Sequence, residues 1–201
     1  MDNYKDWLYA LLKTEPIPPE DIPDIGLYMD QVTTLMDTRL AGSKRYPDDK
    51  ILTKTMINNY TKNHLLPPSD KKKYSREHML LLVFIYYFKN MLSFHDIEAL
   101  FAPITEGHFM DASGLSLQDI YEEVFSMEYE QMKRLKEDLL RKFHASEESF
   151  TDQKEDKDYL QLFTFICALG FDVFLKKQAM EMLIDQIRED YPVDHSKKKK
   201  S

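Results

Sequence analysis

The chain has 201 residues, of which 43% are apolar and 31% charged, and its formal charge is −8. This composition suits one globular domain, or a small domain with an appendage. The single cysteine, Cys167, excludes a disulfide framework, a four-thiolate zinc site and a paired-thiol redox motif, and it fits a reducing cytoplasm. Five glycines and nine prolines among abundant Leu, Lys, Glu, Asp and Met predict a mainly α-helical protein.

No segment of the sequence predicts export or membrane insertion. The first residues, MDNYKDWLYALLKTEP, carry early charges and lack an apolar run with a small-residue cleavage site. The longest unbroken apolar run, 79–88, is far shorter than the roughly 20 residues of a membrane helix. The segment 159–175 is more apolar in total but is interrupted by Gln161, Gly170 and Asp172. We therefore expect a cytoplasmic protein without a membrane span.

The first quarter of the chain predicts two helices separated by a connector. Apolar residues at helical spacing indicate a short helix over 2–13. Four prolines between residues 15 and 23 forbid a helix there. Asp24 is a suitable N-cap for a second helix from Ile25 to about Leu40.

A short helix over 54–62, capped by Thr53 and ending before Pro67, has two different faces. The apolar side comprises Met56, Ile57 and Tyr60. Opposite it, within about 140°, lie side chains that are polar and include no acid: Lys54, Thr55, Asn58, Asn59 and Lys62. These residue types read base edges and phosphates in the major groove. The alternative is an ordinary solvated face, which usually includes an acidic residue.

The charge of the chain is unevenly distributed. The segment 42–90 contains ten basic and four acidic residues, a formal charge of +6, which leaves −14 for the rest. Such a basic module within an acidic protein is typical of an element that binds a polyanion. A lysine-rich solvated face would give the same count, so charge alone leaves both interpretations open.

Two further helices and a break follow the short helix. Ser75 caps a helix over 76–91 so apolar around its circumference that we expect it to be buried on nearly all sides. Ser93 and Asp96 form a capping box that opens a helix reaching Phe101, and Pro103, Gly107 and Gly114 mark a break over 102–114.

The C-terminal part predicts two long helices. Ser116 and Asp119 form a second capping box, opening a helix to about Phe143. A polar, acidic linker over 144–158 precedes a helix over 159–190, with Gly170 as a kink or a close-packing point. The basic run 196–201 is too short to fold.

Two stretches resemble a known family of regulators. LTKTMINNYTKNHLLPP, residues 52–68, resembles the second helix of MerR-type winged helix-turn-helix regulators. KKKYSREHMLLLVFIYYFKNMLSFHDIEALF, residues 71–101, is similar to their wing tyrosine, Ser-capped third helix and following helix. The whole chain also resembles an uncharacterised family from Gram-positive bacteria, known as a domain of unknown function with a MerR-like N-terminal half.

The resemblance implies a role for each matching segment. The helix 54–62 would enter the major groove, Lys71, Lys72, Lys73 and Tyr74 would lie on the wing against the phosphate backbone, and Arg76 would lie near a phosphate. The chain departs from the family pattern in its short wing and in His64, which replaces the glycine that ends the recognition helix. The absence of a thiol pair disfavours heavy-metal sensing.

Catalytic chemistry is not indicated. The neighbouring His and carboxylate residues at 77–78, 95–96 and 108–111 lack metal-binding spacing, and we interpret these histidines as structural. No phosphate-binding loop, dinucleotide fingerprint or nucleophile elbow is present. The sequence therefore predicts no enzyme activity, no metal site and no cofactor.

The last two helices are rich in aromatic residues and methionine: Phe163, Phe165, Phe171, Phe174, Met180 and Met182. We interpret these residues as core together with a dimer seam. The alternative is a pocket for a small apolar effector or for a helix of another protein.

These observations combine into one hypothesis. We expect a mainly α protein with a connector and N-terminal helix at 1–23, a MerR-like winged helix-turn-helix at 24–101, a helical dimerisation or effector domain at 102–195, and a basic tail at 196–201. Its expected function is that of a homodimeric transcriptional regulator that binds double-stranded DNA. The expected DNA-binding residues are Lys54, Thr55, Asn58, Asn59, Lys62, Lys71, Lys72, Lys73, Tyr74 and Arg76. The alternative is a protein–protein adaptor that uses the same shape to bind an acidic partner.

Overall fold

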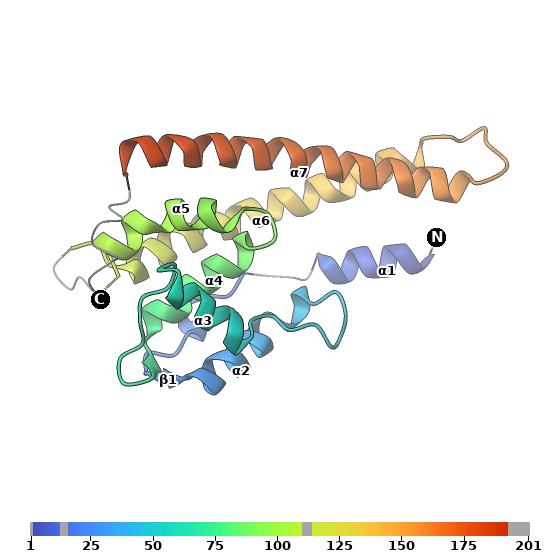
Figure 1. Cartoon of the computed structure of the whole chain (residues 1–201). Helices are drawn as coiled ribbons and strands as arrows, with labels where there is room; N and C mark the ends of the chain where they lie inside the picture. The colour runs from blue at the N-terminus through green and yellow to red at the C-terminus, as the bar shows by residue number, and fades with distance from the viewer. Residues whose placement is uncertain (1, 13–15, 110–113, 193–201) are drawn as a thin grey trace. The chain divides into compact units, whose positions relative to one another are not determined.

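The computed structural model describes residues 2–12, 16–109 and 114–192 and is mainly helical, as predicted (Figure 1). The helices are α1 (Asp2–Leu11), α2 (Met29–Arg39), α3 (Lys54–Lys62), α4 (Arg76–Phe88), α5 (Phe94–Gly107), α6 (Leu117–Glu147) and α7 (Lys157–Asp190). Two short 3-10 helices, η1 (Pro19–Asp21) and η2 (Ala41–Ser43), and two strands, β1 (Leu27–Tyr28) and β2 (Lys73–Tyr74), complete the described elements. The predicted basic tail, 196–201, lies outside the described residues.

The chain forms two compact units, which divide it differently from the expected domains. The core unit contains residues 17–125 and the chain from residue 180 onward, and the hairpin unit contains residues 1–16 and 126–179. Residues 102–125 belong to the core unit, where the Tyr121 hydroxyl donates a buried hydrogen bond of 2.7 Å to the carbonyl oxygen of Ile17. No local sequence pattern indicates this contact across 104 residues.

Helix α4 is the centre of the core unit. Seven of its residues are buried, from His78 to Val83 and Ile85, and these surround the helix as its apolar sequence predicts. Capping predictions are also confirmed. The Thr53 hydroxyl accepts a hydrogen bond from the Met56 amide at the start of α3, and the Ser93–Asp96 box closes the start of α5.

The predicted start of the second helix at Ile25 is wrong. Helix α2 begins at Met29, because Leu27 and Tyr28 form β1 and pair antiparallel with Tyr74 and Lys73 of β2. The Tyr28 amide caps the helix by donating to the Gln31 side chain at 2.9 Å, and Ile25 is 65% exposed. Pairing with strand residues 45 and 47 positions away thus replaces the first helical turn.

The predicted break at residue 102 is also wrong. Helix α5 continues through Pro103 to Gly107, although a proline inside a helix removes one backbone hydrogen bond and costs about 3 kcal/mol. Phe101 is buried and Ile104 packs against the same core, so tertiary packing offsets the local cost.

The hairpin unit is built from α6, α7 and α1. Leu8, Phe143 and Phe165 form its buried core, and the rings of Phe143 and Phe165 meet edge to face at 5.3 Å between centroids. Helix α7 is continuous through Gly170, where an added Cβ would meet nothing within 4 Å. Among the described residues, α7 is long and apolar enough, by length and composition, to cross a membrane. The expectation that it does not do so stays a prediction.

Candidate nucleic-acid interface

Helix α3 presents the two faces that its sequence predicts. Ile57 is 0% and Tyr60 8% exposed, and Met56 is partly buried against the same core. The five polar residues of the opposite face are all exposed: Lys54, Thr55, Asn58, Asn59 and Lys62. The apolar side therefore anchors the helix and leaves the amine, amide and hydroxyl groups in solvent.

Few polar interactions join the polar face of α3 to the other described residues. Lys54 forms an ion pair with Asp30 of α2, and both side chains are more than half exposed. Such exposed pairs are worth about 0–1 kcal/mol, so a phosphate could replace Asp30 at small cost. Within the described part of the chain, the side-chain amides of Asn58 and Asn59 make no hydrogen bond.

Helix α3 ends in a Schellman motif with histidine at the position that normally requires glycine. The Leu65 amide donates to Tyr60 O at 2.9 Å, and the His64 amide donates to Thr61 O at 3.1 Å. These two bonds satisfy the last carbonyls of the helix, and they place His64 at φ 61°. Histidine at this position therefore adopts the glycine geometry and adds local strain.

A tight turn with lysines at its tip lies between α3 and α4. The Lys73 amide donates to Asp70 O at 2.8 Å, and the two central residues, Lys71 and Lys72, have φ angles of 47° and 65°. Two positive φ angles and this bond are the pattern of a type I′ turn, which favours Asn-Gly. Both lysines are exposed, and both have the left-handed backbone conformation that is unfavourable for residues with a Cβ.

The turn is fixed to the unit through Lys73. Lys73 pairs with Tyr28 in the two-stranded sheet, and its ammonium group lies 5.5 Å from the centre of the Tyr28 ring. A Cβ at Gly26 would come within 3.3 Å of the Lys73 side chain, so the absent side chain at Gly26 makes room for it. Helix α2 packs against both α3 and β2, which brings the turn and α3 to one scaffold.

Two of the expected DNA-binding residues are placed differently from the rest. Tyr74 is 6% exposed, because it alternates with Lys73 along β2 and its side chain enters the core, where its ring meets that of His78. Arg76 is partly buried, and its guanidinium donates to Pro19 O at 2.9 Å. Both side chains therefore pack within the unit next to the turn, and neither is exposed alongside the lysines.

His78 holds the segment that leads into the turn. Its Nδ1 accepts a hydrogen bond from the Ser75 amide at 3.0 Å, which leaves Nε2 as the donor toward Pro68 O at 3.3 Å. The ring is 4% exposed and also packs edge to face on Phe109. Burial lowers the pKa of His78, so the neutral ring is the form that fits.

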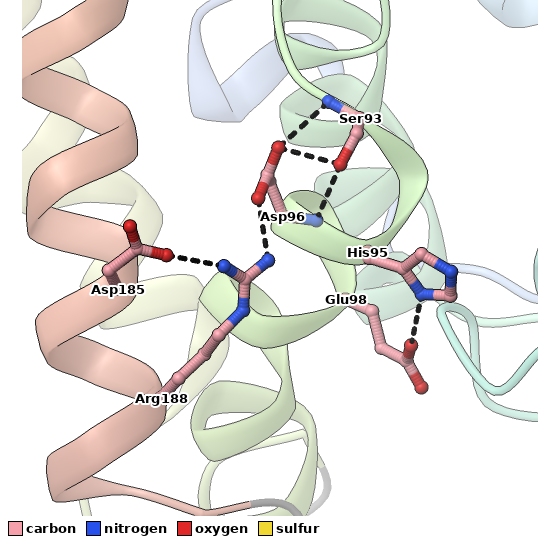
Figure 2. Close-up of polar contacts among 6 residues, drawn as sticks. All are labelled: Ser93, His95, Asp96, Glu98, Asp185 and Arg188. Carbon is pink, nitrogen blue, oxygen red and sulfur yellow. Dashed lines mark hydrogen bonds and ion pairs between the residues drawn. The ribbon is translucent and has the colours of Figure 1, made fainter.

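The buried side of α3 rests on the start of α5. The rings of Tyr60 and Phe94 stack with centroids 6.5 Å apart. Figure 2 shows the next contacts, in which Asp96 accepts from Ser93 and from the guanidinium of Arg188, the latter at 2.6 Å. The Ser93 hydroxyl, with help from Arg188, holds the pKa of Asp96 below its ordinary value. The last turns of α7 are thereby fastened to the helix that supports α3.

Several basic residues of the charge-rich segment have structural partners that the charge count could not reveal. Lys44 pairs with Asp37 at 2.7 Å. The Lys89 ammonium donates to Ile51 O at 2.6 Å, and burial lowers its pKa. A local sequence pattern gives no signal for either bond. Across the described residues, no three His, Cys, Asp or Glu side chains gather in a way that could hold a metal ion.

Comparison with known families adds one match. Residues 17–124 match the family described as Domain of unknown function (DUF1836), and this range covers more than half of the chain. The chain belongs to the DUF1836 family. The DUF1836 match nearly coincides with the continuous part of the core unit and contains both α3 and the lysine turn. No curated protein and no solved structure matches the chain.

Proposed function

We propose that this DUF1836 protein is a transcriptional regulator that binds duplex DNA. In this proposal α2 and α3 act as a helix-turn-helix of the MerR type, α3 enters the major groove, and the lysine turn is a short wing on the phosphate backbone. The protein acts in the cytoplasm as a homodimer, because one small module needs a second half-site to reach useful specificity.

The observation that carries the proposal is the exposed face of α3. Five polar side chains without a carboxylate stand opposite a buried apolar face, and three exposed lysines lie in the neighbouring turn on the same scaffold. Asn58 and Asn59 offer amides that can pair with adenine, and lysines can contact guanine or phosphate. The strain at Lys71 and Lys72 supports a functional reason for keeping lysine there, since strained backbone gathers at binding sites.

The structure narrows the expected contact set. The proposed DNA contacts are Lys54, Thr55, Asn58, Asn59, Lys62, Lys71, Lys72 and Lys73. We propose Tyr74 and Arg76 as residues that position the turn, because their side chains are occupied within the unit.

A charge-reversal experiment tests the proposal. Replacing Lys71, Lys72 and Lys73 with glutamate is expected to abolish binding to a generic duplex. The melting temperature should fall only slightly, because all three side chains are exposed and the loss of the contact between Lys73 and the Tyr28 ring costs about 0.5–1 kcal/mol. The matched control reverses three basic residues of the hairpin unit, Lys133, Arg134 and Lys154, which changes the net charge equally. Equal loss in both variants would reduce the effect to net charge, and unchanged affinity in the first would refute the wing.

The adaptor alternative rests on the same basic surface. An acidic protein partner would also be attracted to these lysines, but it would not reproduce the counterion release that a DNA duplex gives. Tight binding to duplex DNA with a steep dependence on salt favours the regulator, and its absence favours the adaptor.

A further inference from the structure

The outward side of α7 in the hairpin unit carries an apolar surface that the other helices of this unit leave uncovered. Exposed residues on this side are between 51% and 73% accessible: Tyr159, Phe163, Ile166, Phe171, Phe174 and Leu175. At about 100° per residue, Phe163 and Phe174 lie about 160–180° around the helix from the buried Phe165. These six side chains expose roughly 700 Å². The largest apolar patch of a typical monomer is only about 300–600 Å².

The inward side of α7 is already occupied by α6. Gln161 is 2% exposed, and its amide donates to the carbonyl oxygens of Glu147 and Ser149. Further along, Asp172 forms an ion pair with Lys142, which also pairs with Asp138. The polar residues that interrupt the apolar segment therefore face α6, and they leave the outward side without charge from Tyr159 to Phe174.

We propose that this outward face is a homodimer interface, in which α7 of two copies pair antiparallel with Cys167 at the centre of the contact. The four helices of the two α6–α7 hairpins then lie in one layer, with the two α7 helices side by side in the middle. This pairing does not depend on DNA binding. The same face of the second copy covers this apolar face. The area that each copy would bury, roughly 700 Å², is close to the roughly 800 Å² per partner of a standard stable interface.

The charges at the two ends of the segment set the direction of pairing. The loop and first residues before it, 147–158, carry six acidic and two basic side chains, and Lys176 and Lys177 follow it. Antiparallel pairing brings the acidic end of one copy to the lysines of the other. Parallel pairing would place lysines against lysines and the acidic loops against each other, which is unfavourable.

The register follows from the position of the charges. The uncharged outward stretch lies between Asp158 and Lys176, and its midpoint is residue 167. Pairing about this midpoint buries the full stretch in both copies and places Asp158 opposite Lys176. Gly170 lies on the outward side, where an added Cβ meets nothing in the protomer, so two helices can approach closely there.

A lipid surface fits the same face less well. If α7 entered a bilayer alone, Gln161 and Asp172 would lie in hydrocarbon without their α6 partners. If α6 entered with it, the charged side chains of α6 would also lie in hydrocarbon. Separation of α7 from α6 would also break the ion pair between Lys142 and Asp172. A second copy covers the outward face and keeps every contact with α6.

The mass of the full-length protein in solution tests the interface. Sedimentation velocity is expected to give a dimer of twice 23.9 kDa at micromolar concentration. Phe174→Asp and Gly170→Arg are expected to raise the dimer dissociation constant about 100-fold or more, because each buries two unpaired charges in the dimer. Gly107→Arg is the matched control, since an added Cβ there also meets nothing within 4 Å, and it should stay dimeric.

A monomeric wild-type protein would overturn the proposal, as would a dimer that survives Gly170→Arg. Folding of this variant is checked by helical circular dichroism. Replacement of a helical glycine with arginine favours the helix by about 0.8 kcal/mol, so loss of the dimer cannot be confused with unfolding.

Cross-linking tests the direction. With a short bismaleimide, the native Cys167 should join two copies, because it lies beside its counterpart. Phe174→Cys in a Cys167→Ser background should not, because antiparallel pairing separates the two positions by about 21 Å, at 1.5 Å per residue. Efficient cross-linking at position 174 would show parallel pairing and refute the register. Flotation of monomeric protein with phosphatidylethanolamine–phosphatidylglycerol vesicles would instead assign the face to lipid and refute the dimer.

Discussion

Replacement of Lys71 with Asn and Lys72 with Gly tests whether the lysine turn trades stability for binding. Both lysines have positive φ angles, 47° and 65°, which cost L-residues about 1 kcal/mol each. Asn-Gly is the preferred pair for this turn. Glycine at position 72 offsets up to about 1 kcal/mol of this stabilisation, because it increases the conformational entropy of the unfolded chain. We therefore expect the free energy of unfolding to rise by about 1 kcal/mol and the melting temperature by roughly 2–4 °C.

The same double variant should bind DNA less tightly. Each lysine that neutralises a phosphate contributes about 0.9 to the slope of log K against log salt, so loss of two per protomer should reduce the magnitude of the slope by about 1.8 per protomer, or about 3.6 for the homodimer. Fluorescence anisotropy with a labelled duplex at several salt concentrations measures this slope, and thermal unfolding followed by circular dichroism measures the stability.

A second double variant separates strain from charge. Lys71→Gln with Lys72→Gln removes the same two charges but keeps both side chains in the left-handed conformation. It should lose the same DNA affinity without the gain in melting temperature. If the Asn-Gly protein is no more stable than the Gln-Gln protein, the turn is not strained. If neither variant binds duplex DNA less tightly, the lysines are not phosphate contacts.

Three further outcomes are expected. His64→Gly should raise the free energy of unfolding by about 1 kcal/mol, because His64 has φ 61° at a helix end, whereas His64→Ala, which keeps a Cβ, should not; chemical denaturation distinguishes them. Burial holds the pKa of His78 below its ordinary 6.5, so the unfolded chain binds a proton first and stability should fall as pH drops through 6.5. His78→Gln should flatten that fall in melting temperature between pH 7 and 5, and an unchanged pH profile would exclude His78 as its source. Alanine at Asn58 and Asn59 should relax sequence preference among selected DNA fragments, and a uniform loss of affinity would limit both residues to backbone contacts.

The sequence predicted α3 well because its information is local. The positions of Ile57 and Tyr60 on one side and the polar residues on the other follow from helical periodicity, and Thr53 is a capping residue read directly from the chain. The lysine tip of the turn was likewise visible as a run of charge after two prolines. Its left-handed backbone was not, because lysine gives no signal for a positive φ.

The sequence was uninformative where distant residues decide local structure. Tyr74 is buried, and the first turn of α2 is absent, because β1 and β2 pair residues that are 45 and 47 positions apart. Arg76 binds Pro19 O, which lies 57 residues earlier in the chain. Pro103 is tolerated inside α5 because its neighbours pack in the core. Single-sequence periodicity contains none of these pairings.

The salt dependence of duplex binding by the intact protein shows whether α3 and the lysine turn contact phosphates. Five lysines on α3 and the turn can each neutralise one phosphate. For a homodimer with ten such lysines, log K should fall linearly with log salt with a slope of about −6 to −9, at about −0.9 per phosphate. A slope near zero, or no measurable binding to duplex DNA at low salt, would contradict this prediction.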